Sequence, residues 1–141
     1  MDVNLKQVWE VGLLALCLWR EARNQPADAI TAVACSIRNR TLKPAWWNSM
    51  HAMDYIEVIL HPEQYSSFNA GDVNAAKMPL SSDLIFPQCL EIAQSIWDGT
   101  QSDTIQGAQS YFDRSLDSNP PQWANTQTHI CDVGDFHFYR A

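Results

Sequence analysis

Residues 11–19 (VGLLALCLW) form an apolar run that limits the fold of this chain more than any other segment. The run continues from a capping box at Asn4 and Gln7, so we expect a core helix over residues 5–23 that is apolar nearly all round. It is far shorter than the roughly 20 residues that cross a bilayer. The Arg-Glu-Ala-Arg sequence at residues 20–23 offers no signal-peptide cleavage site. We therefore expect a protein synthesised in the cytoplasm, without a signal peptide and without a membrane span.

The composition is that of one compact domain spanning residues 1–141. Of the 141 residues, 46% are apolar and 18% are charged. Nine basic residues against sixteen acidic residues give a net charge of −7, which argues against nucleic acid as a partner. No C-x-x-C pair occurs, so we expect reduced thiols at Cys17, Cys35, Cys89 and Cys131. We expect a monomer that uses no cofactor and no metal.

Hydrophobic periodicity predicts three further helices. The second covers residues 26–40, and a capping box at Asp54 and Glu57 opens a short helix over residues 54–60. The last of the three is a long helix over residues 87–98. Its inward-facing residues are predicted to be Leu90, Ala93, Ile96 and Trp97.

The pattern changes period after residue 107. Residues 110–112 and 130–139 alternate between apolar and polar side chains, with a turn at residues 133–135. This alternation predicts a small antiparallel sheet near the C-terminus. The expected fold class is therefore α+β, mainly helical.

Glu21 is the most informative polar residue because it follows the apolar run within one helical turn. A carboxyl group at a buried helix end loses hydration, and this loss raises its pKa. A carboxyl that keeps its proton near neutral pH is what a general acid needs to protonate a departing glycosidic oxygen. The alternative is that Glu21 forms an ion pair with Arg20, Arg23 or Arg38, which would lower its pKa.

Five short segments, in order along the chain, carry a resemblance to a known family. They are Leu-Cys-Leu-Trp-Arg-Glu-Ala-Arg-Asn-Gln-Pro at residues 16–26, Ile-Arg-Asn-Arg at 37–40 with Ala-Val-Ala before it at 32–34, Gln-Tyr-Ser at 64–66, Gly-Ala-Gln-Ser-Tyr-Phe at 107–112 and His-Phe-Tyr at 137–139. Together they resemble the spore-cortex-lytic type of bacterial cell-wall hydrolases. That family has a helix ending in Glu-Ala-Arg-Gly-Glu, followed by a helix ending in Asn-Arg.

The resemblance implies a lysozyme-like fold and an enzyme that cuts peptidoglycan glycan strands between N-acetylmuramic acid and N-acetylglucosamine. The essential acid of the family is the first Glu of its Glu-Ala-Arg pattern, which here is Glu21. Its Gly-Glu becomes Asn24-Gln25, so a carboxylate at Gln25 is absent. The resemblance also implies lytic transglycosylation, in which the muramic 6-hydroxyl replaces water. That chemistry fits a site with one obligatory carboxyl group.

Asp113 is a candidate second carboxylate because it lies at the end of a predicted strand. It would activate water in a muramidase-type hydrolase, whereas a solvated strand-end residue is the structural alternative.

Several polar and aromatic residues are candidates for binding the substrate. Loop residues offer hydrogen bonds to N-acetyl and hydroxyl groups, and aromatic rings stack on sugars, although loop capping and core packing are alternatives for each of them. The candidates are Gln64, Ser66, Tyr111, His137 and Trp123, with Trp46 and Trp47 as further stacking residues.

Two interpretations belong to other classes of protein. A metal site would form if His129, Cys131 and His137 met across the C-terminal hairpin, but their spacing matches no standard zinc signature. A noncatalytic peptidoglycan-binding module would use the six tryptophans, yet it would not need Glu21 at a buried helix end. We expect an enzyme that acts at the bacterial cell wall, in the periplasm, and that is phage-encoded as an endolysin or a virion-associated lysin.

Overall fold

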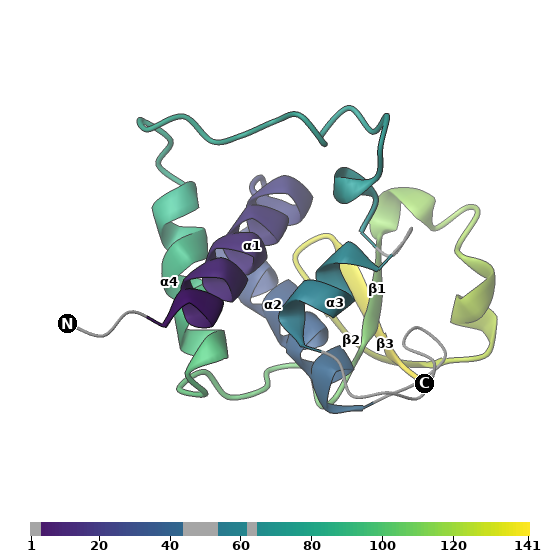
Figure 1. The fold of residues 1–141 in the computed structure, drawn as a ribbon. Helices are drawn as coiled ribbons and strands as arrows, with labels where there is room; N and C mark the ends of the chain where they lie inside the picture. The colour runs from purple at the N-terminus through teal and green to yellow at the C-terminus, as the bar shows by residue number, and fades with distance from the viewer. Residues whose placement is uncertain (1–3, 44–53, 62–64) are drawn as a thin grey trace.

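The structure, a computed structural model, describes residues 4–43, 54–61 and 65–141. This described part contains α-helices followed by a three-stranded sheet (Figure 1). The helices are α1 (Leu5–Ala22), α2 (Ala27–Leu42), α3 (Tyr55–Leu60) and α4 (Phe86–Trp97). The strands are β1 (Ser110–Asp113), β2 (Thr128–Val133) and β3 (Phe136–Arg140). Short 3₁₀ helices lie at η2 (Ser66–Phe68), η3 (Arg114–Leu116) and η4 (Gln122–Asn125). The predicted α+β, mainly helical fold is confirmed.

Side-chain caps explain why two helix starts were predictable. Asn4 Oδ1 accepts a hydrogen bond from the Gln7 N–H at 3.1 Å, and Asp54 Oδ1 accepts one from the Glu57 N–H at 2.9 Å. Each cap satisfies a backbone donor that the first turn of a helix leaves without an intrahelical partner.

The core forms where α1 packs against the other helices. The apolar run of α1 is largely buried, as predicted, and α2 and α4 contribute apolar faces of their own. Fully buried side chains from these helices include Leu14, Leu18, Ile30, Ile37 and Ile96. Of the helices that the structure describes, none is long and apolar enough to cross a membrane.

The prediction that Leu90 faces inward is wrong. Leu90 is 37% exposed, whereas its neighbour Cys89 is completely buried. The buried residues of α4 are Cys89, Ala93 and Ile96, so the stripe that packs on the core begins one position earlier than predicted. A shift of one residue turns a side chain by about 100° around the helix axis.

The sheet is antiparallel, with the strand order β1-β3-β2. In β2, His129 pairs with Tyr139, but Cys131 pairs with Phe138, so the register shifts between His129 and Cys131. Ile130 is the extra residue of this β-bulge. Beyond a bulge, the side chains of a strand change faces relative to the simple alternation that the sequence suggests.

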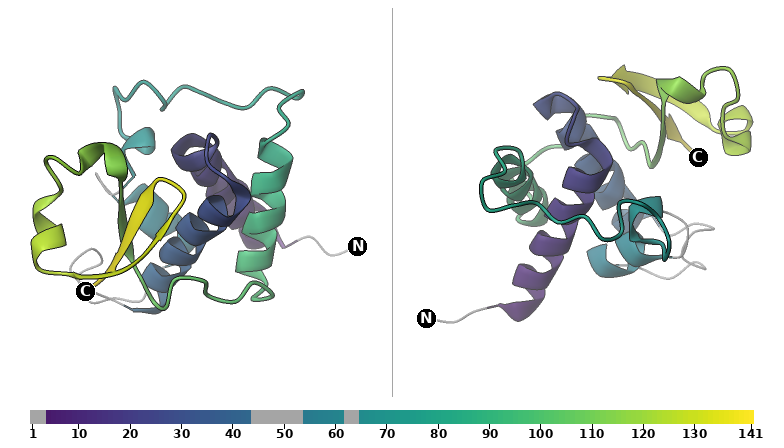
Figure 2. Two further views of the ribbon diagram at one scale, coloured as in Figure 1. Left: turned by 180° about the vertical axis from the view of Figure 1, so that it is seen from behind. Right: turned by 90° about the horizontal axis from the view of Figure 1, so that it is seen from above.

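The sheet lies to one side of the helices, and a long connection from η2 to α4 crosses the C-terminal end of α1 (Figure 2). Arg20 fastens this connection because its guanidinium group donates hydrogen bonds to the carbonyl oxygens of Ser67, Ala75 and Lys77. The same group lies 4.7 Å from the centre of the Phe68 ring. The connection is therefore held against the residue that directly precedes Glu21.

Candidate active site

Glu21 lies in the last turn of α1, and its side chain is half-buried. Ser67 Oγ donates a hydrogen bond to Glu21 Oε1 at 3.3 Å. The guanidinium groups of Arg20, Arg23 and Arg38 donate instead to backbone carbonyl oxygens, and none of the three forms an ion pair with Glu21. The arginine-pairing alternative is therefore wrong for these three residues.

Burial raises the pKa of Glu21 above its ordinary value. The hydrogen bond from Ser67 lowers this pKa, whereas the negative charge of Asp72 raises it. Desolvation is the largest of the three effects, since it penalises the ionised carboxylate. Glu21 consequently keeps its proton to a higher pH than an exposed glutamate, which is the state that a general acid requires.

Two hollows meet at Glu21. The first, which we call the Trp123 hollow, has a volume of about 490 Å³ and is lined by Glu21, Tyr65, Ser66, Tyr111, Asp113 and Trp123, among others. The second, which we call the Asn74 hollow, has a volume of about 300 Å³ and is lined by Glu21, Arg23, Asn24, Asn74 and Asp113, among others. Because Glu21, Asp113 and Phe136 line both hollows, a chain-like ligand has room on either side of the Glu21 carboxyl group.

Most of the site residues named from the sequence that the structure describes lie around the Trp123 hollow. Ser66, Tyr111, Trp123 and Asp113 all line it together with Glu21. Asp113 Oδ1 also accepts a hydrogen bond from the Ser115 N–H at 2.8 Å and thereby caps η3. Gln64, Trp46 and Trp47, which were also predicted to bind the substrate, lie outside the described residues.

His137 is the exception, because it faces the opposite side of the sheet. Tyr111 packs against Phe136, with the ring centres 5.1 Å apart, while the next residue, Phe112, packs against His137 at 5.0 Å. Neighbouring residues of a strand point to opposite faces, so Tyr111 and His137 lie on different faces. His137 lines a separate hollow with His129 and Asp132, away from Glu21.

Two residues next to Glu21 were not predicted from the sequence. Ser66 was the candidate, but the hydroxyl that binds Glu21 belongs to the adjacent Ser67. Tyr65 was not a candidate, yet its side chain is 4% exposed and lines the Trp123 hollow. The Tyr65 hydroxyl is buried and finds no hydrogen-bond partner among the described residues. The Gln-Tyr-Ser segment was the available signal, although it did not show which hydroxyl reaches the carboxyl group.

The sequence profile of the cell wall hydrolase family matches residues 24–139. The chain belongs to the cell wall hydrolase family. This membership confirms the family resemblance and shows that the protein is a cell-wall-hydrolysing enzyme. The matched segment begins three residues after Glu21, so it includes the far walls of both hollows but not the carboxyl group itself.

Two solved structures have a similar fold. The catalytic domain of the germination-specific lytic transglycosylase SleB from Bacillus anthracis has a TM-score of 0.70 and 19% sequence identity, with 99% of each chain covered. The catalytic domain of the Bacillus cereus SleB protein has a TM-score of 0.70 and 20% identity, covering 99% of this chain and 94% of that one. Among curated protein sequences, no significant match is found. At these identities the likeness establishes the fold of this cell wall hydrolase, and the 99% coverage includes α1.

Proposed function

We propose that this cell wall hydrolase cleaves peptidoglycan glycan strands between N-acetylmuramic acid and N-acetylglucosamine as a lytic transglycosylase. The observation that carries the proposal is the position of Glu21. Its half-buried carboxyl group, with a raised pKa, lies where the Trp123 hollow meets the Asn74 hollow. A glycan strand that fills both hollows has its scissile bond beside this one group.

In the proposed reaction Glu21 acts first as an acid and then as a base. Its proton passes to the bridging oxygen as the bond from that oxygen to C1 of the muramic residue breaks. The resulting carboxylate takes the proton of the 6-hydroxyl of the same residue while O6 bonds to C1. The second transfer restores the protonated Glu21 and consumes no water. An internal hydroxyl has a high effective concentration, so it replaces a water molecule that a second carboxylate would otherwise activate.

A muramidase-type hydrolase is the second candidate, and the position of Asp113 favours it. Asp113 lines both hollows with Glu21, as a second carboxylate must. One of its oxygens, however, already accepts the Ser115 N–H and caps η3. We therefore propose that Asp113 shapes the groove and that the 6-hydroxyl of the muramic residue is the nucleophile.

Mass spectrometry of digested peptidoglycan tests the proposal. Lytic transglycosylation yields muropeptides that end in a 1,6-anhydro ring and are lighter than the hydrolytic products by one water molecule. The control is Asp113→Asn, which retains a side-chain oxygen for the cap but has no charge. Anhydro products from both the wild type and Asp113→Asn support the proposal. Reducing ends in the wild-type digest, together with an inactive Asp113→Asn enzyme, would establish a two-carboxylate hydrolase instead. Wall binding that survives with no cleavage product would contradict the proposed cleavage of the glycan strand.

The expected place of action follows from the substrate and is the bacterial cell wall. The expectations of a phage endolysin, of a monomer and of synthesis without a signal peptide rest on the sequence alone and stay predictions.

A further inference from the structure

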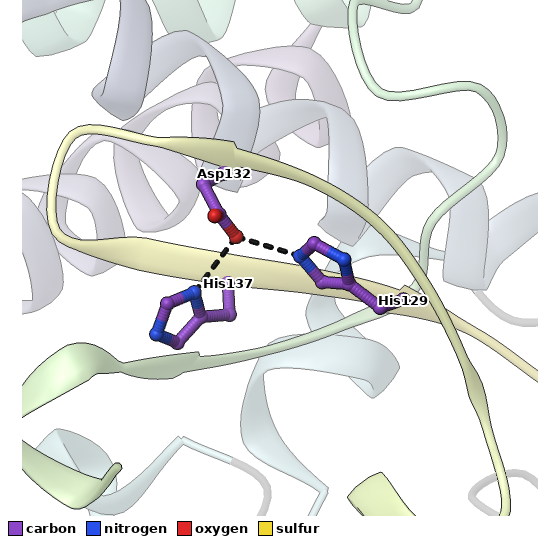
Figure 3. A group of neighbouring side chains, drawn as sticks. All are labelled: His129, Asp132 and His137. Carbon is purple, nitrogen blue, oxygen red and sulfur yellow. Dashed lines mark hydrogen bonds and ion pairs between the residues drawn. The ribbon is translucent and has the colours of Figure 1, made fainter.

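A second cluster of chemically active side chains lies on the sheet face that points away from Glu21. Asp132 Oδ1 lies 2.6 Å from His129 Nε2 and 2.7 Å from His137 Nδ1 (Figure 3). Figure 3 shows both imidazole rings directed at this one carboxyl group, with His129 and Asp132 on β2 and His137 on β3. The candidate ligand atoms of the three residues all lie within 4.8 Å of one another. The cluster opens into a hollow of about 420 Å³ that Asp117 also lines.

The β-bulge at Ile130 creates this cluster. Under simple alternation, His129 and Cys131 would share a face of β2, which is the set that the sequence suggested. The extra residue instead places His129 and Asp132 on the same face, where Asp132 is the register partner of His137. Cys131 packs against the hydrophobic core. The structure therefore exchanges a thiol for a carboxylate in the candidate ligand set.

Asp117 completes an outer shell around the cluster. His137 Nε2 lies 2.7 Å from Asp117 Oδ1, while its Nδ1 faces Asp132. Each of the two ring nitrogens thus has a carboxylate oxygen at hydrogen-bond distance, although a neutral imidazole carries a single N–H. A protonated imidazolium satisfies both carboxylates, because it donates from both nitrogens. A metal cation near Nδ1 also satisfies them, since the ring then donates its one N–H from Nε2 to Asp117. In metal sites a histidine ligand usually donates its other N–H to a carboxylate or a carbonyl oxygen, which orients the ring.

We propose that His129, Asp132 and His137 form a binding site for one divalent transition-metal ion of the Zn²⁺ type, with Asp117 orienting His137. Two imidazoles and one carboxylate are a donor set that suits Zn²⁺, and solvent supplies the fourth ligand. Tetrahedral Zn²⁺ with bonds of about 2.0 Å sets its ligand atoms about 3.3 Å apart. Each of the two imidazole nitrogens must therefore move several tenths of an ångström away from Asp132 Oδ1. His129 and Asp132 have room for this movement, because their side chains are 48% and 53% exposed.

The ion would join β2 to β3 rather than take part in glycan cleavage. Its ligands come from both strands of the hairpin and from no other element. The side chains that pack around the cluster, Phe112 and Tyr139, lie on the face of the sheet opposite Tyr111. Binding is therefore expected to stabilise the folded protein, because a ligand that binds only the native state raises its free energy of unfolding.

Titration calorimetry with ZnCl₂ on untagged, chelator-treated protein tests the site. One ion is expected to bind per chain and to raise the melting temperature. His129→Gln and Asp132→Asn are each expected to weaken binding by about tenfold or more, and Asp117→Asn by about tenfold, since outer-shell partners also affect affinity. The matched controls are Cys131→Ser and His61→Gln, which remove a neighbouring thiol and an imidazole elsewhere on the chain. Both controls should bind as the wild type does.

Several outcomes would overturn the proposal. One is the absence of zinc binding by the wild type at millimolar ZnCl₂. Another is unchanged affinity in both His129→Gln and Asp132→Asn, whose exposed side chains are replaceable without disturbing the core. Weaker binding in Cys131→Ser would return the thiol to the ligand set, and an equal loss in His61→Gln would show adventitious binding. Substitution with Co²⁺ gives an independent readout, because a spectrum without a thiolate charge-transfer band supports the nitrogen and oxygen ligands.

Discussion

Gln25 and Asp135 bind each other through two hydrogen bonds across 110 residues of sequence. Gln25 Nε2 donates to Asp135 Oδ2 at 3.0 Å, and the Asp135 N–H donates to Gln25 Oε1 at 3.0 Å. The pair joins the turn between α1 and α2 to the turn between β2 and β3. Gly134 makes this contact possible, because a Cβ at that position would lie 2.7 Å from Gln25 Oε1. Its φ of +56° also favours glycine.

Gln25→Glu is expected to destabilise the protein near neutral pH. The family pattern has an acidic residue at this position. In this chain, however, only an amide can both donate to the Asp135 carboxylate and accept a hydrogen bond from the Asp135 backbone N–H. A carboxylate would lose the donor and face a like charge, so we expect a loss of about 1–2 kcal/mol. Urea unfolding measures this loss, and the control Asn24→Asp adds the same charge one residue earlier. An equal effect from both variants would mean that the pairing with Asp135 is not responsible.

Glu21→Gln is expected to abolish wall lysis while leaving the fold intact. Glutamine keeps the shape of the side chain and its hydrogen bond with Ser67 but has no acidic proton for the leaving oxygen. Loss of general acid catalysis reduces the rate by on the order of 10² to 10⁴. The measurement is the clearing rate of a cell-wall suspension, and Asp113→Asn serves as the matched carboxyl-to-amide control. A Glu21→Gln enzyme with more than about a tenth of the wild-type rate would remove Glu21 from its proposed role.

The raised pKa of Glu21 predicts that the stability of the wild type depends on pH in a way that the stability of Glu21→Gln does not. The folded state holds this proton more tightly than the unfolded state, so Glu21 contributes stability that is fully present below its unfolded pKa. This contribution is lost as pH rises through the higher folded pKa. Unfolding measured across that window should show Glu21→Gln gaining stability relative to the wild type as pH rises. Parallel curves would indicate that burial does not shift the pKa of Glu21.

Activity should follow the same ionisation. Because the acid must be protonated before cleavage, kcat/KM is expected to fall as pH rises through the raised pKa of Glu21. A pH–rate profile with a soluble glycan substrate measures this limb. If kcat/KM falls instead at the ordinary pKa of glutamate, the carboxyl group of Glu21 is not desolvated in the free enzyme.

Tyr65→Phe is expected to stabilise the free protein. The Tyr65 hydroxyl is buried without a hydrogen-bond partner among the described residues, and such a group costs about 1–3 kcal/mol. Phenylalanine keeps the ring and its packing. Thermal unfolding should show a higher melting temperature, with Tyr111→Phe as the aromatic control in the same hollow. A lower melting temperature for Tyr65→Phe would mean that water or another group satisfies the hydroxyl.

The order of elements and the position of Glu21 were predictable from the sequence because local interactions determine them. The apolar run specifies a buried α1, and the caps at Asn4 and Asp54 bond to backbone groups only three residues away. Glu21 follows the run within one turn, so partial burial and a raised pKa were expected from its place at the end of a buried helix, although distant segments complete its surroundings. The alternation of residues 110–112 and 130–139 likewise predicts strands, since period two is a local property.

Only the tertiary structure decided which side chains meet. Ser67 reaches Glu21 from 46 residues away, and neither helix periodicity nor strand alternation distinguishes it from Ser66. The bulge at Ile130 places Asp132 rather than Cys131 beside His129. Pairing with Phe112 on β1 places His137 on the face of the sheet that points away from Glu21. Sequence patterns record the period of each element, whereas register, bulges and the packing of distant segments depend on the whole folded chain. A shift of one residue in any of them moves a side chain to another face.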